Sequence, residues 1–456
     1  MKKKGENSYK MSKYNELVDI NGKHFLINLL TGNIVELDDE FFPKIREAIN
    51  FDVDLKNLFS NEDLEFLLRR GFIVESKIEE LDILKIWWKK GFSQNVLSLT
   101  LEPTLRCNFA CTYCFEDTVN GGTMGNKEVN KLLKFIKNYM KRERINTLEI
   151  SWFGGEPLLV KNVIDEITQG VREIFKELKI DFEEGYSASL VTKGSLLDSS
   201  VLEKLKIWKI KMVQITIDGS EMVHNLRRPF RGGKPSFNVV FKNFINLLKF
   251  IEGESLSIKV NLRCNFSLDV RDKVIEVFDM IPERYRKNIN VYCKHYFPKS
   301  SEWRGMKLVS SLVHEQSISE VEAGLSMEVF RKGYKSERMK IGGAYFYCPA
   351  STMHHFELTP DLKVYKCNVA VGARPPVGEI TDEGNIKYNV EELKKWILID
   401  PFEDETCKSC KLLPICMGGC PLARVNRRRG CLIGLDNLNK ILTLELTKII
   451  LKGGGS

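Results

Sequence analysis

The cysteines of this chain stand in groups with short spacings, and this grouping restricts what the chain can fold into more than any other feature. Twelve of its 456 residues are cysteines. The positively charged N-terminus has no apolar stretch behind it, so we expect no secretory signal and no framework of disulfides. Three cysteines, Cys107, Cys111 and Cys114, directly follow the apolar run Val96 to Leu101. This grouping favours metal binding by thiolates in a reducing environment.

The triplet has the spacing C-x3-C-x2-C, with Tyr113 before its last cysteine. Iron–sulfur cubanes are normally held by four thiolates, so a set of three leaves one iron without a protein ligand. An outside molecule can bind and react at that open iron. The spacing alone leaves two alternatives open, which are three buried structural cysteines and three of the four ligands of a zinc site.

Length and composition exclude several classes of protein. A chain of this length is expected to form two to four domains, and 43% apolar with 29% charged residues is ordinary for a globular protein. No run of about eighteen apolar residues occurs, so we predict a cytoplasmic protein without a membrane partner. The net charge of +8 is dispersed, so we expect no nucleic-acid partner. The dense basic run Arg424 to Arg429 is interpreted either as a solvated loop or as a contact to an acidic peptide or an anionic cluster.

Strand-like and helix-like segments alternate from Leu97 onward, which predicts an α/β fold with a parallel sheet. The expected strands are Leu97 to Leu101, Leu148 to Phe153, Ala188 to Thr192, Val213 to Ile217, Ile258 to Leu262 and Asn290 to Cys293. Amphipathic helices fill the gaps, for example Val129 to Met140. The chemistry of such sheets gathers at the carboxyl ends of the strands. The cysteine triplet lies just past the end of the first strand, as this rule requires.

A second motif, Gly154-Gly155-Glu156-Pro157, stands at the end of the second strand. Together with the triplet, this loop resembles the signature of the radical S-adenosylmethionine (SAM) superfamily. The resemblance implies a partial (β/α)6 TIM barrel, a [4Fe-4S] cluster held by the triplet, and SAM bound by the loop and at the open iron. The glycines permit close approach of the backbone, and the carboxylate of Glu156 suits the ammonium group of SAM.

The third strand supplies a further part of the SAM site that the resemblance implies. The segment Leu190 to Ser195 resembles the family's Thr-Asn-Gly segment near the ribose. Lys193 stands where the family has Asn, so only Thr192 is carried over to the SAM-binding set. Tyr113 joins this set as the aromatic residue of the triplet.

The segment that follows the fourth strand contains a candidate for the SAM carboxylate. His224 to Arg228 resembles the family's His-Asp-x-x-Arg segment, which places Arg228 where a guanidinium pairs with that carboxylate. A surface arginine is the alternative. Asp218 is expected to orient the same loop, and His224 is expected to be structural rather than catalytic. No residue is assigned as the catalytic acid or base.

The last part of the chain carries seven more cysteines, which are Cys348, Cys367, Cys407, Cys410, Cys416, Cys420 and Cys431. Their spacing resembles the SPASM extension, which implies two auxiliary [4Fe-4S] clusters and three clusters in all. By the family pattern, the distal cluster would be held by Cys407, Cys410, Cys416 and Cys431. The proximal cluster would be held by Cys348, Cys367 and Cys420. A zinc ribbon that uses the first two cysteines of the distal set is the alternative.

The chain departs from the SPASM pattern at two positions. Leu362 stands where the pattern has Gly, which puts the local turn in question. The proximal set is also one thiolate short, because no Cys lies a few residues before Cys348. Cys264 and Cys293 are candidates for the vacancy, although cysteines in predicted strands are more often buried in the core. A thiolate of the substrate could also fill it.

The N-terminal region reads as a small separate unit. Three short strands, Glu16 to Ile20, His24 to Asn28 and Asn33 to Leu37, precede two helices, Phe41 to Phe51 and Asn61 to Arg70, and a strand at Phe72 to Val74. This order resembles the winged-helix recognition element of peptide-modifying enzymes, in which an extended leader peptide adds to the edge of the sheet. A structural cap and a DNA-binding wing are the alternatives.

These resemblances divide the chain as follows. Residues 1–81 form the recognition element, 82–96 a linker helix, 97–300 the radical SAM barrel, 301–345 a connector, 346–436 the SPASM domain, and 437–456 a C-terminal helix and tail. The basic run lies in the SPASM domain. We treat the final Gly-Gly-Gly-Ser as a flexible tail.

The resemblance implies a maturase that modifies a ribosomally made precursor peptide, with a reductase, flavodoxin or ferredoxin as electron donor. In this family a 5′-deoxyadenosyl radical abstracts hydrogen from the peptide, and an auxiliary cluster accepts the substrate electron. The vacancy in the proximal set favours a Cys thioether crosslink, as in sactipeptide and ranthipeptide maturases. The alternatives are a carbon–carbon or carbon–oxygen crosslink, formylglycine formation by an anaerobic sulfatase maturase, and a non-catalytic iron–sulfur protein that binds peptides. An RNA-modifying enzyme is the weakest option.

Overall fold

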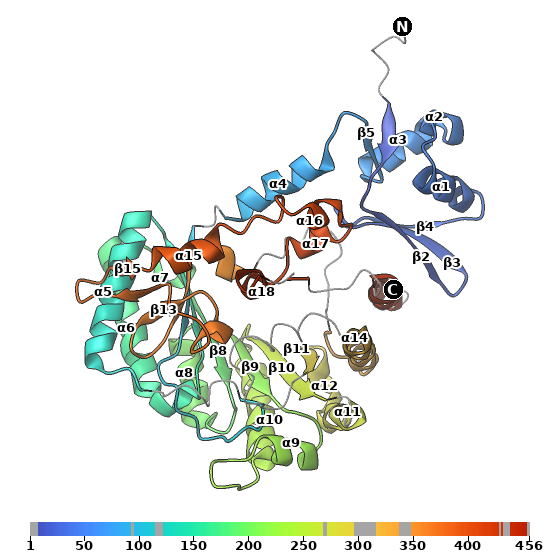
Figure 1. Cartoon of the computed structure of the whole chain (residues 1–456). Helices are drawn as coiled ribbons and strands as arrows, with labels where there is room; N and C mark the ends of the chain where they lie inside the picture. Colours follow the sequence, from blue (N-terminus) through green and yellow to red (C-terminus); the bar gives the residue numbers. More distant parts are fainter. Residues whose placement is uncertain are drawn as a thin grey trace.

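The computed structural model describes residues 8–92, 95–114, 122–267, 271–295, 316–336, 348–427, 430–431 and 438–453 (Figure 1). A small N-terminal unit lies at one end of the molecule, and helix α4 (Glu80–Gly91) leads from it to a large sheet. Most of the predicted connector, 301–345, lies outside the described residues, as do two arginines of the basic run. Within the described ranges, no helix combines the length and the apolar character that a bilayer-spanning segment requires.

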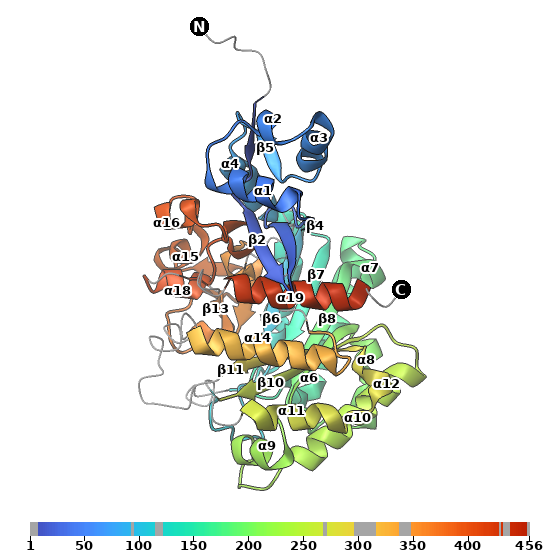
Figure 2. The ribbon, with the colours of Figure 1, turned by 90° about the vertical axis from the view of Figure 1, so that its right-hand side faces the viewer.

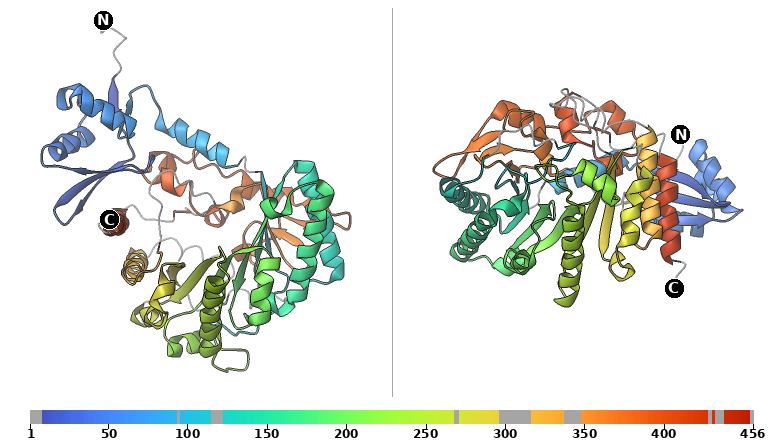
Figure 3. Two further views of the ribbon diagram at one scale, coloured as in Figure 1. Left: turned by 180° about the vertical axis from the view of Figure 1, so that it is seen from behind. Right: turned by 90° about the horizontal axis from the view of Figure 1, so that it is seen from below.

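The large sheet confirms the predicted parallel order. Its first six strands are β6 (Val96–Leu101), β7 (Thr147–Trp152), β8 (Tyr186–Thr192), β9 (Ile210–Thr216), β10 (Lys259–Phe266) and β11 (Ile289–His295). Each of these strands pairs in parallel with the next one in the chain. The linking helices include α5 (Asn126–Glu143), α6 (Lys161–Leu178), α8 (Ser199–Ile207), α10 (Phe237–Gly253) and α11 (Arg271–Met280), and they lie along the outside of the curved sheet (Figures 1 and 3).

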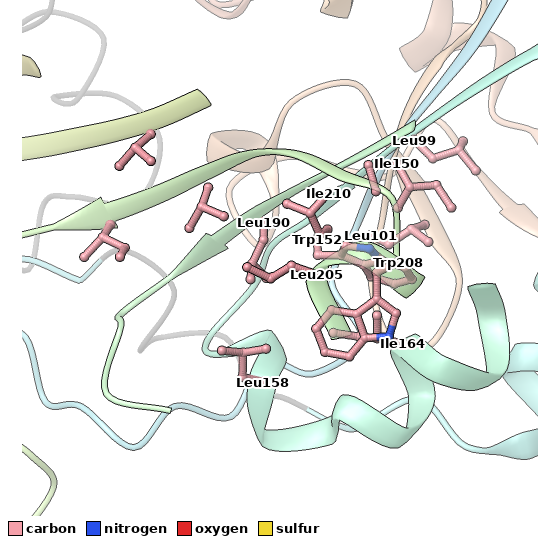
Figure 4. Packing of buried hydrophobic residues seen from close by; sticks show 14 of the residues in the cluster. Leu99, Leu101, Ile150, Trp152, Leu158, Ile164, Leu190, Leu205, Trp208 and Ile210 are labelled. Carbon is pink, nitrogen blue, oxygen red and sulfur yellow. The ribbon is translucent and has the colours of Figure 1, made fainter. Parts of the chain in front are cut away.

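The core of this region lies between the sheet and the helices. Alternate residues of the strands are buried there, among them Leu99, Trp152 and Leu190, and they pack against Ile164 and Trp208 from the helical side (Figure 4). Full burial of each such aliphatic side chain stabilises the fold by about 1.5–3 kcal/mol. The other face of the strands is more polar and only partly buried. This face is therefore available for a site.

The cysteine-rich segment extends the same sheet, which was not predicted. Strand β12 (His355–Leu358) pairs in parallel with β6, and β13 (Lys363–Tyr365), β14 (Gly378–Ile380) and β15 (Ile386–Tyr388) follow in antiparallel order. The turn between β12 and β13 forms, although Leu362 stands there in place of the Gly of the SPASM pattern. Leu362 takes the left-handed conformation there with φ of 60°, a cost of about 1–2 kcal/mol that burial of its side chain offsets.

The N-terminal unit contains the predicted three-stranded antiparallel sheet. Its strands are β2 (Asn15–Ile20), β3 (Lys23–Asn28) and β4 (Ile34–Leu37), and β4 forms one edge. Asn21 and Gly22 both have positive φ, as a two-residue hairpin turn of type I′ requires. Helices α1 (Phe41–Asn50), α2 (Leu55–Leu58) and α3 (Asn61–Arg69) pack on one face. Strand β5 (Ile73–Glu75) pairs with β1 (Tyr9–Met11), a strand that was not predicted.

The other face of the N-terminal sheet packs against the C-terminal part of the chain. Helix α19 (Leu438–Gly453), predicted within 437–456, lies between β2 and helix α14 (Gln316–Arg331) (Figure 2). Lys448 of α19 is buried and donates hydrogen bonds to Ser326 Oγ and Ser336 O, each at 2.7 Å. The C-terminal helix thus connects the N-terminal unit to the barrel.

Candidate functional site

The cysteine triplet lies in a loop that follows the carboxyl end of β6. Backbone hydrogen bonds hold this loop against the segment after helix α9 (Glu221–Arg227), since the N–H groups of Ala110 and Thr112 donate to Pro229 O and Arg227 O, both at 2.9 Å. Cys111 is buried, and Cys107 and Cys114 are half-buried. The three sulfur atoms therefore belong to a loop that backbone hydrogen bonds hold in place.

The thiol of Cys107 is not ionised by the protein alone. Burial raises the pKa of Cys107 to about 11, and the nearby Lys193 opposes this shift only in part. Metal binding requires a thiolate, so it must release this proton. This chemistry suits a cluster that binds tightly and does not suit an activated free cysteine.

The Gly154–Pro157 loop packs directly on the segment that precedes the triplet. Gly155 N donates to Thr104 O at 3.1 Å, and Glu156 N donates to Arg106 O at 2.9 Å. Gly154 has φ of 101°, and a Cβ atom on Gly155 would lie 2.2 Å from Arg106 O. Two glycines are therefore needed to bring the two loops together.

Replacement of Gly155 by Ala is expected to destabilise the protein by about 3 kcal/mol, because the atoms in the way are backbone atoms that cannot move aside. The measurement is the urea midpoint of unfolding. Gly253→Ala is the control, since nothing lies within 4 Å of a Cβ atom there. Equal midpoints for the two variants would contradict the close contact of the two loops.

The carboxylate of Glu156 is occupied within the loop. It accepts hydrogen bonds from Leu158 N at 3.0 Å, Thr192 Oγ1 at 2.9 Å and Lys193 N at 2.7 Å. Burial raises the pKa of Glu156, and Lys193 and these donors oppose the shift. Glu156 and Thr192 thus join the ends of β7 and β8. In the same loop, Gly154 O accepts from Lys193 Nζ at 3.3 Å.

Arg228 is buried and aims at the triplet, so it is not the surface arginine of the alternative interpretation. Its Nη1 donates to Tyr113 Oη at 2.8 Å, and that hydroxyl donates to Asp218. Its Nε and Nη2 have no hydrogen-bond partner among the described residues. Burial opposes the charge, but Cys111, Tyr113 and Asp218 outweigh it and hold the pKa of Arg228 above its usual range.

The residues around Arg228 fix its position. Asp218 accepts from Asn265 N at 3.0 Å, and Asn265 Nδ2 donates to Tyr113 Oη at 2.9 Å. His224 Nδ1 accepts from Asp218 N at 3.3 Å, and burial lowers the pKa of His224 to about 2, which keeps it neutral. The structure thus gives His224 the structural position that was expected of it. Asn265 is a member of this network that the sequence did not indicate.

The site has the chemistry that SAM would need. Two buried, unpartnered guanidinium N–H groups match the two oxygens of a carboxylate in planar, bidentate geometry. They lie beside Cys111, in the loop whose three sulfur atoms suit a cluster with one open iron. An amino acid carboxylate held by Arg228 would therefore lie next to that iron.

The C-terminal cysteines were expected to form two sets, and the structure places several expected members of each set near one another. Burial raises the pKa of Cys348 and Cys367, and Cys420 adds to both shifts, so these three lie within electrostatic reach of one another. Burial likewise raises the pKa of Cys407 and Cys410, and Cys431 adds to both shifts. Cys416 ends the short helix α17 (Leu413–Cys416) and packs against the same apolar cluster as Cys407 and Cys410.

The two sets are joined by the backbone. Cys420 N donates to Gly430 O at 2.7 Å, which brings the chain before Cys431 back to the proximal set. Within the described residues, no group of three or more His, Cys, Asp or Glu side chains is arranged to hold a single metal ion. The thiolates of a cubane each bind a different iron, so they do not converge on one point.

Cys264 and Cys293 do not join the proximal set. They are register partners on β10 and β11, at the other end of the sheet from β12, and both are buried in the core between sheet and helices. Burial raises the pKa of Cys264, with Cys293 adding to the shift. These two cysteines have the core position that their strand context favoured.

Two charged residues lie at the cysteine sets, and only Arg424 belongs to a segment that the sequence analysis named. Arg424 Nη2 donates to Cys407 Sγ at 2.9 Å, which fits the interpretation of the basic run as compensation for an anionic cluster. Lys366 is buried next to Cys348 and donates to Thr352 O and His355 O. Burial lowers the pKa of Lys366 to about 7, and Cys348 opposes this. The only signal for Lys366 in the sequence is its place before Cys367.

Comparison with known proteins agrees with this geometry. The model of the radical SAM superfamily matches residues 101–261, which contain the triplet, the Gly154–Pro157 loop and Arg228. The radical SAM cyclopropyl synthase TigE of Paramaledivibacter caminithermalis is 22% identical over 274 residues, 52% of this chain and 56% of that protein. A cysteine-type anaerobic sulfatase-maturating enzyme of Clostridium perfringens is 25% identical over 357 residues, 72% of this chain and 90% of that protein.

A solved structure shows the same fold over most of the chain. It is native anSMEcpe with bound AdoMet and Cp18Cys peptide, with a TM-score of 0.55 and 20% identity over 78% of this chain and 99% of that one. The chain spans about half the length, 44% and 56%, of the first curated relatives that it matches. The family match and the fold agree on the region that holds the triplet. The chain therefore contains a radical SAM domain over residues 101–261.

Proposed function

We propose that this protein is a radical SAM enzyme that modifies a ribosomally made precursor peptide, with a Cys thioether crosslink as the product. The observation that carries the enzyme class is Arg228, whose two unpartnered N–H groups are buried beside the cysteine triplet. The triplet would hold a [4Fe-4S] cluster and Arg228 would hold the carboxylate of SAM, and these groups would supply the radical chemistry that removes a hydrogen atom from a carbon of the peptide. The C-terminal cysteines would hold auxiliary clusters able to accept an electron.

The residues of the chain bind and orient SAM for this chemistry. Arg228 holds the carboxylate, and Tyr113 and Asp218 keep the guanidinium in place. Glu156 joins the Gly154–Pro157 loop to the end of β8, and this loop would hold the ammonium group. Burial of these groups excludes water, which strengthens each of their electrostatic interactions.

The N-terminal unit supports a peptide substrate. Among the described residues, β4 pairs with β3 alone, so its outer edge is open to an added strand. Helices α1 to α3 cover one face of this sheet, and the C-terminal segments cover the other. An extended leader peptide would therefore bind along the edge of β4. The peptide in the anSMEcpe structure shows that a protein of this fold binds peptide.

The two cysteine sets would hold the auxiliary clusters, for a total of three [4Fe-4S] clusters. The distal set has four thiols, whereas the proximal set of Cys348, Cys367 and Cys420 has three. We assign the fourth position of the proximal cluster to a thiolate of the substrate, because Cys264 and Cys293 lie in the core. A flavodoxin, ferredoxin or reductase would supply the electron that starts each turnover.

Co-expression with a short Cys-rich peptide encoded near the gene tests this function by mass spectrometry. In a thioether the new S–C bond replaces one S–H and one C–H bond, so the expected product has lost two hydrogens per crosslink. Replacement of the peptide Cys by Ala is expected to abolish the loss. The same loss from the Ala peptide would contradict the thioether and indicate a carbon–carbon or carbon–oxygen crosslink.

Formylglycine formation is the second candidate, because the sulfatase-maturating relative aligns over 90% of its length. Formylglycine carries an aldehyde, so the modified peptide would react with a hydrazide probe. The thioether product would not react. The N-terminal unit favours the thioether, since it resembles the leader-binding element that is expected of a precursor-peptide maturase.

A further inference from the structure

Arg263 of β10 lies on the inner face of the curved sheet, which is turned away from the helices (Figure 3). Its neighbours Leu262 and Cys264 are buried in the core between sheet and helices, and successive side chains of a strand point to opposite faces. The register partners of Arg263 are Thr216 of β9 and Tyr292 of β11. A half-buried guanidinium therefore stands inside the barrel, between two paired strands.

Neighbouring polar side chains hold this guanidinium in one position. Arg263 Nε donates to Asn265 Oδ1 at 2.9 Å, and the guanidinium carbon lies 5.7 Å from the centre of the Tyr292 ring. Tyr292 is itself fixed, because its hydroxyl donates to Gln214 Oε1. The side chain of Arg263 is thus oriented before any ligand binds, which lowers the entropic cost of binding.

The charge of Arg263 is not compensated by an ion pair. No carboxylate of the described residues pairs with it, whereas Lys294 on the adjacent strand β11 pairs with Glu322 at 3.1 Å. Asp218 lies in the same region, but its carboxylate is taken up by the hydrogen bonds that fix Tyr113. The planar fork of a guanidinium matches a carboxylate, so the inner face offers a site for an anionic group of a ligand.

A hydrogen-bonded chain connects this site to the expected position of SAM. Asn265, which accepts from Arg263, donates through Nδ2 to Tyr113 Oη at 2.9 Å. The same hydroxyl accepts from Arg228 Nη1 at 2.8 Å. Two side chains thus separate the two guanidinium groups. Arg228 has N–H groups for the SAM carboxylate, which leaves Arg263 for a second carboxylate close to it.

We propose that Arg263 is a specificity-determining residue that binds the carboxylate of an Asp or Glu side chain of the substrate peptide. This inference rests on the proposed function, since it takes a peptide as the substrate. It adds the chemical class of one residue that the peptide must present inside the barrel, beside the SAM site.

An amide scan of the short Cys-rich peptide encoded near the gene tests the pairing. Each Asp is replaced by Asn and each Glu by Gln, one at a time, which keeps the shape of the side chain and removes its charge. The measurement is kcat/KM for modification by the reconstituted enzyme, followed by mass spectrometry. We expect one of these replacements to lower kcat/KM about 50-fold, mainly through KM, because it breaks a half-buried charge pair.

Arg263→Met completes a double-mutant cycle with that amide peptide. For a direct contact, the two changes together should cost about as much as either change alone, so Arg263→Met should modify the acidic and the amide peptide equally well. Arg263→Lys should keep part of the preference, since an ammonium retains the charge without the fork. Arg172→Met, which removes an exposed arginine of α6, should keep all of it.

Equilibrium binding separates a peptide site from a structural role and from the SAM site. Arg263→Met should bind the acidic peptide about 50-fold more weakly than the wild type, with unchanged iron content and unchanged affinity for SAM. A purely structural role would lower the affinity for acidic and amide peptides by the same factor, and this result would overturn the proposal. A loss of SAM affinity as large as that of Arg228→Met would overturn it as well, because Arg263 would then belong to the SAM site.

The wild-type enzyme gives a test that does not depend on any variant. If it modifies every amide peptide as efficiently as the parent peptide, no acidic side chain is recognised and the proposal is wrong. Absence of any modification of the parent peptide by the wild type would instead contradict the proposed function, so the two failures are distinguishable.

Discussion

Replacement of Cys111 by Ala is expected to abolish the release of 5′-deoxyadenosine from SAM under reducing conditions. The loss should be at least about 1,000-fold, which corresponds to roughly 4 kcal/mol of transition-state free energy. Cys111 is the buried member of the triplet and lies beside Arg228. With two thiolates left, the cluster has no stable attachment, so the open iron that SAM needs is lost.

The measurement is chromatographic detection of methionine and 5′-deoxyadenosine after anaerobic reconstitution. Cys293→Ala is the matched control, because Cys293 is also buried but lies in the core away from both cysteine sets. The Cys111 variant should also retain about eight of the twelve irons expected for three cubanes. Cleavage of SAM at the rate of the control by Cys111→Ala would show that the triplet does not hold the reactive iron.

Replacement of Arg228 by Met is expected to weaken SAM binding about 100-fold while the iron content stays unchanged. Two charge-assisted hydrogen bonds in a buried site contribute about 1.5–3 kcal/mol each. Part of their loss is offset because the Met variant no longer buries a charged group. A net loss of about 2.7 kcal/mol corresponds to the stated factor. This expectation rests on Nε and Nη2 of Arg228, which have no hydrogen-bond partner among the described residues.

Equilibrium binding of SAM to the reconstituted protein measures this effect. Arg228→Lys should bind with intermediate affinity, since an ammonium keeps the charge but cannot bind a carboxylate with two parallel hydrogen bonds. Arg172→Met is the control, because Arg172 is an exposed residue of α6 that contacts the ring of Phe182. If Arg228→Met bound SAM as tightly as Arg172→Met, the guanidinium would have no part in the SAM site.

The local parts of the fold could be predicted from the sequence, because periodicity and turn residues act over short distances. The strands from β6 to β11 were all expected, and so was the position of the triplet after β6. Pairing between distant segments was not. Strand β1 has only three residues. Strand β12 pairs with β6 across more than 250 residues. The local sequence pattern therefore does not indicate either pairing.

The candidate site likewise contains residues that the sequence could indicate and residues that it could not. Residues in short motifs, such as Arg228 and the glycine loop, could be named in advance, since their spacing carries the chemistry. Their partners could not, because they come from other strands. Asn265 reaches Tyr113 from the end of β10. The partners of the Glu156 side chain, Thr192 and Lys193, likewise come from the end of β8.

The central claim is that the triplet holds a [4Fe-4S] cluster with one iron open to SAM. Electron paramagnetic resonance of the anaerobically reconstituted and reduced protein, recorded before and after addition of SAM, tests this claim most directly. We predict that SAM changes the signal of one cluster and leaves the auxiliary signals in place. Spectra that are identical with and without saturating SAM would contradict the account.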